Sequence, residues 1–211
     1  MITLYTWKTP NGRKPAIMLE EIGLPYTVQG IDISADQQFA PAFLAIAPNN
    51  KIPAIVDHDA DGGEQAVFES GAILTYLAAK TGRLLPGAGP GHWATLQWLH
   101  WSIGGLGPML GQLNFFAVRS DQKAPLAIDR FTKESKRLLG VLEKRLAATP
   151  YVAGDEYSIA DIVSYPWVHE ARTKMEAVLS DTFAASPAVS DWLARLAERP
   201  AVAKGMKVLE G

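Results

Sequence analysis

Two short motifs, Ile52-Pro53 and Glu69-Ser70, carry residue types that could together hold one extended peptide. The apolar run Ala54–Val56 predicts a short buried strand directly after Pro53. Proline has no N–H, so it fits the start of a strand, and an X-Pro bond can be cis. A cis bond here would leave the N–H and C=O of Ile52 open to pair with an extended peptide. A simple turn before a strand would use the same two residues.

Glu69-Ser70 begins a predicted helix, because apolar residues follow at helical spacing at Ile73, Leu74 and Leu77. Free backbone N–H groups and the helix dipole favour an anion such as a carboxylate at that position. The Ser70 hydroxyl adds a hydrogen-bond donor, and the Glu69 carboxylate suits an ammonium group. The pair could therefore bind a zwitterionic amino-acid end, while helix capping alone would also explain these residue types.

Thr9 and Asn11 stand where the first loop leads into a helix predicted over residues 12–22. Their hydroxyl and amide groups could cap that helix, or they could donate hydrogen bonds to a thiolate beside the helix N-terminus. The chain has no cysteine, which excludes a disulfide framework, a cysteine zinc site and a protein thiol nucleophile. A thiolate at this position must therefore arrive on a ligand.

Composition narrows the function classes further. A chain of 211 residues is long enough for one large or two small domains, and its 48% of hydrophobic residues allow a sizeable core. The net charge of −2 argues against nucleic acid as a partner. No apolar run approaches the ~18 residues of a membrane-spanning helix, and residues 1–5 alternate like a strand rather than a signal peptide. No histidine has a partner at metal-ligand spacing. The sequence therefore predicts a cytoplasmic protein that uses no metal and binds no membrane.

The first part of the chain predicts an α/β layer with a mixed sheet that ends near residue 80. Its elements are strand, helix, strand, weak helix, strand, strand and helix, over residues 2–5, 12–22, 26–33, 37–46, 54–56, 65–68 and 69–77. A stretch rich in glycine and proline follows and predicts a linker over residues 81–92. The expected domains are therefore residues 1–80 and residues 93–211.

The second domain is expected to be all-α, because no strand pattern recurs after the linker. A glycine-rich run over residues 104–111 should kink a helix or let another backbone approach closely. Residues 128–147 form a strongly periodic helix, and Ser158 and Asp161 form a capping-box pattern with a structural role. Two further helices are expected over residues 188–197 and 201–209.

Three segments, Thr9–Gly12, Asn49–His58 and Phe68–Leu74, agree in order and spacing with one known family. They resemble the bacterial nu-class glutathione transferases, which are disulfide-bond reductases, and the resemblance covers nearly the whole chain. It implies the glutathione transferase fold, with a thioredoxin-like first domain and an all-α second domain. It also implies glutathione as cosubstrate, a small disulfide or electrophile as partner, and a homodimer.

The resemblance also assigns roles to individual residues. Thr9 and Asn11 would lie beside the glutathione sulfur as catalytic groups. Tyr5 is the rival, because many glutathione transferases use a tyrosine near the end of the first strand, but it lies inside the strand here and is expected to pack or to support the site indirectly. Lys51 and Arg130 would meet glutathione carboxylates, Arg130 across a domain cleft, although by sequence alone each could be a surface charge. The full set expected to bind glutathione is Gln38, Asn50, Lys51, Ile52, Pro53, Glu69, Ser70 and Arg130.

Three functions remain open at this stage. The first is reduction of disulfides by the thiolate of bound glutathione, with oxidised glutathione as product, and the missing cysteine favours it. The second is conjugation of glutathione to electrophilic substrates. The third is a non-catalytic glutathione-binding module, which the complete set of expected ligand residues disfavours.

Overall fold

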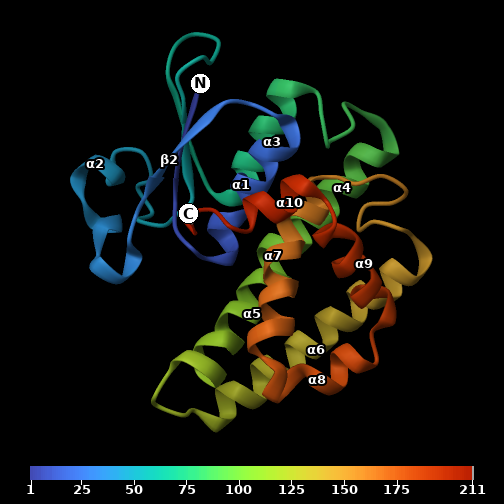
Figure 1. Cartoon of the computed structure of the whole chain (residues 1–211). Coiled ribbons are helices and arrows are strands. Elements are labelled where there is room, and N and C mark those ends of the chain that lie inside the picture. Colours follow the sequence, from blue (N-terminus) through green and yellow to red (C-terminus); the bar gives the residue numbers. More distant parts are fainter. Residues whose placement is uncertain (211) are drawn as a thin grey trace. The chain divides into compact units, whose positions relative to one another are not determined.

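The computed structural model describes residues 1–210, which form two compact units (Figure 1). The first unit is Met1–Leu85 together with the segment that begins at Arg199, and the second is Pro86–Glu198. The first unit combines a mixed sheet with helices, and the second is helical. The fold class predicted from the sequence is confirmed.

Four strands form the sheet of the first unit, in the order β2-β1-β3-β4. The parallel pair is β1 with β2, and the pairs β1–β3 and β3–β4 are antiparallel. All four residues of the central strand β3 are buried, as its unbroken apolar run predicts. The strands span Ile2–Thr6 (β1), Tyr26–Gly30 (β2), Ala54–Asp57 (β3) and Gln65–Phe68 (β4).

Helices α1 and α3 pack against each other in this unit. The weak helix expected over residues 37–46 is instead a 3₁₀ turn at Gln37–Phe39 followed by the short α2. Pro41 explains the break, because a proline without an N–H begins a helix but does not continue one. The helices are α1 (Pro10–Ile22), α2 (Pro41–Leu44), α3 (Ser70–Thr81) and α10 (Pro200–Gly205), with a further 3₁₀ turn at Ile33–Ala35.

The first turn of α1 lies directly against the loop that precedes it. A Cβ atom on Gly12 would lie 2.2 Å from the carbonyl oxygen of Trp7, so only glycine fits there. Gly12 also donates its N–H to Oγ1 of Thr9 at 3.1 Å, and Pro10 occupies the first helical position. The loop end that carries Thr9 is therefore fixed to the helix start.

The C-terminal helix α10 packs on α1, although the sequence places it in the all-α domain. A Cβ atom on Gly205 would lie 2.5 Å from the backbone nitrogen and Cα of Ile17, so the two helices meet backbone to backbone. Because hydrophobic spacing reports only that a helix has an apolar face, it does not reveal which sheet or bundle that face covers.

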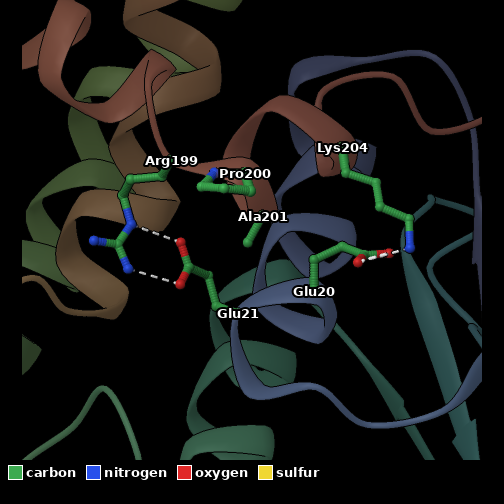
Figure 2. A pocket seen from close by; sticks show the side chains of 6 residues that line it. All are labelled: Glu20, Glu21, Arg199, Pro200, Ala201 and Lys204. Atoms are coloured by element: carbon green, nitrogen blue, oxygen red, sulfur yellow. Dashed lines mark hydrogen bonds and ion pairs between the residues drawn. The ribbon is translucent and has the colours of Figure 1, made fainter.

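Two ion pairs also join α10 and its preceding residue to the end of α1 (Figure 2). The guanidinium of Arg199 binds both carboxylate oxygens of Glu21, at 2.7 and 2.8 Å. The ammonium of Lys204 lies 2.9 Å from a carboxylate oxygen of Glu20. These four residues line a surface pocket of about 430 Å³ in which opposite charges already face one another.

The second unit begins with one helical run that is interrupted by a π-helical turn at Ser102–Leu106 and ends in a second one at Asn114–Arg119. The interruption falls at the start of the glycine-rich run, where a kink was expected. Ser158 and Asp161 form the predicted capping box. Among residues 1–210 no helix has the length and apolar character needed to cross a membrane. The helices are α4 (Gly89–Trp101), α5 (Gly107–Leu113), α6 (Pro125–Ala148), α7 (Ile159–Lys174), α8 (Glu176–Ala184) and α9 (Pro187–Ala197).

Candidate functional site

A small pocket of about 70 Å³ lies in the first unit where the N-termini of α1 and α3 meet the entry to β3. Six residues line it, and the sequence had singled out all six. They come from three segments that are separated in the chain and brought together by the fold. The lining residues are Asn11, Lys51, Ile52, Pro53, Glu69 and Ser70.

The Ile52-Pro53 peptide bond is cis, as predicted. Pro53 is buried, and the half-buried Ile52 side chain packs against a cluster that includes Phe43 and Ala54. Outside the regular elements, no main-chain hydrogen bond within the described chain uses the N–H or C=O of Ile52. The entry to β3 therefore presents one residue whose backbone can pair with an extended ligand.

Tyr5 belongs to the same apolar cluster. It lies inside β1, pairs in register with Ala54, and its ring is 6.3 Å from that of Phe43. This position agrees with the packing role expected for Tyr5.

Glu69 and Ser70 form the entry to α3. The backbone of Glu69 has φ 68°, an unusual value for a residue other than glycine, and such values concentrate at binding sites. Ser70 is the first residue of the twelve-residue helix and is 6% exposed. An exposed carboxylate thus stands beside a helix N-terminus with a buried hydroxyl, an arrangement suited to an ammonium and a carboxylate on one ligand.

Thr9 and Asn11 stand at the N-terminus of α1. Thr9 caps the helix, since its Oγ1 accepts the Gly12 N–H, and it does not line the pocket, whereas Asn11 does. A hydroxyl that accepts one hydrogen bond still has its own proton to donate. The cap is therefore compatible with the second role expected for Thr9.

Lys14 is a charged residue of this region that the sequence interpretation missed. It lies on α1, three residues after Asn11, and is 1% exposed. Burial lowers the pKa of its ammonium from 10.5 to about 7, and the negative charge of Glu69 opposes part of that change. The one signal in the sequence is a lysine among the apolar residues of a helix, which is usually a surface charge.

Three expected ligand residues lie outside the pocket lining. Gln38 sits on the 3₁₀ turn after β2, and its buried Oε1 has no hydrogen-bond partner among the described residues. Asn50 has φ 49° and donates its N–H to the Ala47 carbonyl, immediately before the pocket residue Lys51. Arg130 is an exposed residue of α6 in the second unit, and its contact with glutathione stays a prediction.

No group of three or more histidine and carboxylate residues is positioned to hold a metal ion within residues 1–210. The pocket offers backbone N–H groups, a hydroxyl, an amide and an ammonium as hydrogen-bond donors, and the Glu69 carboxylate as an acceptor. Together these groups can orient a zwitterionic peptide and stabilise an anion beside a helix end.

Residues 1–79 match the model for the N-terminal domain of glutathione S-transferase, and residues 107–200 match the model for its C-terminal domain. The chain belongs to the glutathione S-transferase family. Among curated relatives in this family, the disulfide-bond oxidoreductase YfcG of Escherichia coli K12 is 50% identical over 208 residues. That alignment covers 98% of this chain and 94% of YfcG.

Solved structures of other glutathione transferases share this fold closely. A family member from Pseudomonas fluorescens with two glutathione bound has TM-score 0.92 and 42% identity, and the match covers 97% of this chain and 92% of that one. A glutathione transferase from Pseudomonas putida with one glutathione disulfide bound per subunit has TM-score 0.92 and 43% identity, over 98% and 91% of the two chains.

Proposed function

We propose that this protein is a glutathione-dependent disulfide-bond reductase in which the thiolate of bound glutathione attacks the disulfide. The observation that carries the proposal is the set of backbone and side-chain groups that line one pocket at two helix N-termini, in a chain without cysteine. Half of the aligned residues are identical to those of a disulfide-bond oxidoreductase, and similar structures contain glutathione or its disulfide.

Each part of glutathione finds a matching group in this pocket. The cysteinyl backbone pairs with the N–H and C=O of Ile52 as an added strand. The γ-glutamyl carboxylate meets Ser70 at the start of α3, and the γ-glutamyl ammonium faces Glu69. Lys51, together with the expected ligand residues Gln38 and Asn50, attracts the glycine carboxylate.

The sulfur then lies beside Thr9 and Asn11 at the start of α1. Lowering a thiol pKa from about 8.5 to about 6.5 requires about 2.7 kcal/mol. A hydrogen bond to a charged group supplies about 1.5–3 kcal/mol, and a helix N-terminus about 0.3–1 kcal/mol. Two donors and the end of α1 are therefore sufficient to ionise the thiol near neutral pH without a protein base.

The reaction follows as two exchanges. The bound glutathione thiolate attacks one sulfur of the substrate, a glutathione mixed disulfide forms, and the other half leaves as a thiolate that takes a proton from solvent. A second glutathione thiolate attacks the glutathione sulfur of the mixed disulfide. Oxidised glutathione and the second substrate thiol are released, so two thiols are oxidised for each disulfide reduced.

The direct test compares turnover of a small model disulfide and of an aryl halide, each with glutathione, under identical conditions. We expect disulfide reduction to exceed conjugation. Robust conjugation with negligible disulfide reduction would replace the proposal by a conjugating transferase. Binding of glutathione with neither activity would leave a non-catalytic module.

Thr9→Ala is expected to raise the pKa of bound glutathione by about 1–2 units, because it removes one donor to the thiolate. Disulfide turnover near neutral pH should fall by no more than about 3-fold, because the thiolate fraction falls about 3- to 25-fold while each thiolate becomes about 3- to 8-fold more nucleophilic. The ultraviolet absorbance of the thiolate, recorded as a function of pH, measures the pKa of the bound thiol. Thr9→Ser retains both the cap and the donor and is the matched control. An unaltered thiol pKa in Thr9→Ala would transfer the role to Asn11 or the backbone.

Ser70→Ala is expected to weaken glutathione binding by roughly 1–3 kcal/mol, or about 5- to 150-fold in Kd, because the ligand carboxylate loses a hydroxyl donor. Isothermal titration calorimetry measures the change. Ser180→Ala, at an exposed position on α8, makes the same chemical deletion away from the pocket and should leave Kd unaltered. Wild-type affinity in Ser70→Ala would refute the assignment.

The proposal also includes the cytoplasmic location predicted from the composition, and the homodimer and the carboxylate contact of Arg130 that the family resemblance implies. Light scattering behind size exclusion tests the dimer. Arg130→Gln tests the contact, because loss of a charge-assisted hydrogen bond should raise the KM for glutathione.

A further inference from the structure

Lys14 is a buried lysine on α1, one turn along the helix from the pocket residue Asn11, and it is not part of the pocket lining. Residues three apart share one face of a helix, so Lys14 lies on the same face of α1 as the pocket residue Asn11. Long helical side chains point back toward the helix N-terminus and cover the preceding turn. We therefore expect the ammonium of Lys14 to lie toward the turn that contains Asn11.

Helix α3 packs against α1, and the negative charge that favours the protonated form of Lys14 belongs to Glu69, the residue before α3. Lys51 also lines the pocket, from the segment before β3. Other charged side chains on α1, α3 and α10 have ion-pair partners: Arg13 with Glu210, Glu20 with Lys204, Glu21 with Arg199 and Lys80 with Asp57.

A ligand in this pocket alters the charge around Lys14. Glutathione carries one ammonium and two carboxylates, so it is a net anion, and ionisation of its thiol adds a further negative charge. In the free protein, burial keeps the pKa of Lys14 at about 7, so much of Lys14 is neutral slightly above that pH. Added negative charge beside a lysine favours its protonated form.

We propose that Lys14 is a proton-linked counterion for glutathione, which takes up a proton when the anionic peptide occupies the pocket beside Asn11 and Glu69. This inference rests on the proposed glutathione site. When the thiol ionises on binding, its proton leaves to solvent, and Lys14 gains one from solvent. By reciprocity, the protonated Lys14 lowers the pKa of the bound thiol, so the two ionisations support each other.

The test uses S-methylglutathione, which has no thiol to ionise, in calorimetric titrations at about pH 8 in two buffers of different ionisation enthalpy. The difference in heat gives the number of protons exchanged. We expect the wild type to take up roughly 0.3–0.9 proton per ligand, because about nine-tenths of Lys14 is neutral there. Lys14→Met should take up almost none. Lys8→Met removes a lysine from the exposed loop before α1 and should behave as the wild type.

A second measurement requires no variant. In the wild type the uptake should be near zero at about pH 6, where Lys14 is already protonated, and should grow toward about pH 8. Equal proton uptake by Lys14→Met and the wild type, or uptake that does not vary with pH, would overturn the role of Lys14 while the glutathione site stands. Failure of the wild type to bind S-methylglutathione and glutathione would overturn the site and this inference together.

Discussion

Lys14→Met is expected to raise the free energy of unfolding by about 5 kcal/mol near pH 6 and by little above about pH 10.5. Lys14 is fully buried, and the pKa of its ammonium falls from 10.5 in the ordinary state to about 7 in the fold. A lowering of about 3.5 units at about 1.4 kcal/mol per unit gives this size. Methionine has a similar length and no charge to desolvate, so it fills the same space without that penalty.

The pH dependence follows from which state holds the proton. Below about pH 7, Lys14 is protonated in both the folded and the unfolded chain, so the folded protein bears the whole cost of a buried ammonium. From about pH 7 to 10.5 only the unfolded chain holds the proton, so the stability of the wild type rises with pH. Above 10.5 both states are neutral and the advantage of methionine disappears. Urea unfolding at three pH values measures the effect.

Lys8→Met is again the control, because a surface charge contributes little and should alter stability by less than about 0.5 kcal/mol at every pH. A gain in Lys14→Met that is equally large at all pH values would instead assign the effect to packing. Residues that bind ligands often lower the stability of the fold, and a buried lysine near a ligand pocket is expected to do so. This is why we assign Lys14 to ligand binding rather than to the core.

The pocket could be predicted from sequence because its residues act through local backbone geometry. A proline before an apolar strand and a serine at a helix start leave signals within a few residues, at Ile52-Pro53 and Glu69-Ser70. The burial of Lys14 leaves no such signal, since it depends on the elements from distant parts of the chain that pack around α1. A lone lysine on a helix is usually exposed, so the sequence alone favours the wrong environment.

Local sequence patterns could not predict two features of the boundary between the units, the start of α4 and the packing of α10. Gly89 and Pro90 belong to the stretch expected as a linker, yet α4 begins at Gly89, because proline is also favoured in the first turn of a helix. Helix α10 packs with the sheet unit through Gly205, and a glycine late in a helix is usually a stop signal rather than a contact. Proline occurs both in linkers and in the first turn of helices, and glycine both ends helices and allows close helix contacts. Only the tertiary contacts decide which role applies.

Asp161→Ala is expected to lower the free energy of unfolding by about 3–5 kcal/mol, because it leaves several buried donors without an acceptor. The carboxylate of Asp161 is fully buried and accepts the N–H groups of Val152 and Ser158 at 2.9 and 3.0 Å. It also accepts the indole N–H of the buried Trp192 at 2.9 Å. Burial raises the pKa of Asp161, which shows that the buried carboxylate carries a desolvation cost. The alanine variant removes this cost, and that offsets part of the lost stability.

Two further variants make this prediction specific. Asp161→Asn retains one oxygen acceptor but turns an amide N–H₂ toward a former donor, so it should cost less, about 1–3 kcal/mol. Asp155→Ala removes an exposed carboxylate from the loop before α7 and should cost less than about 0.5 kcal/mol. Urea unfolding followed by tryptophan fluorescence gives all three values. A loss below about 1 kcal/mol in Asp161→Ala would mean that water or a rearranged backbone satisfies these donors, and that the capping box does not anchor α7 and α9 together.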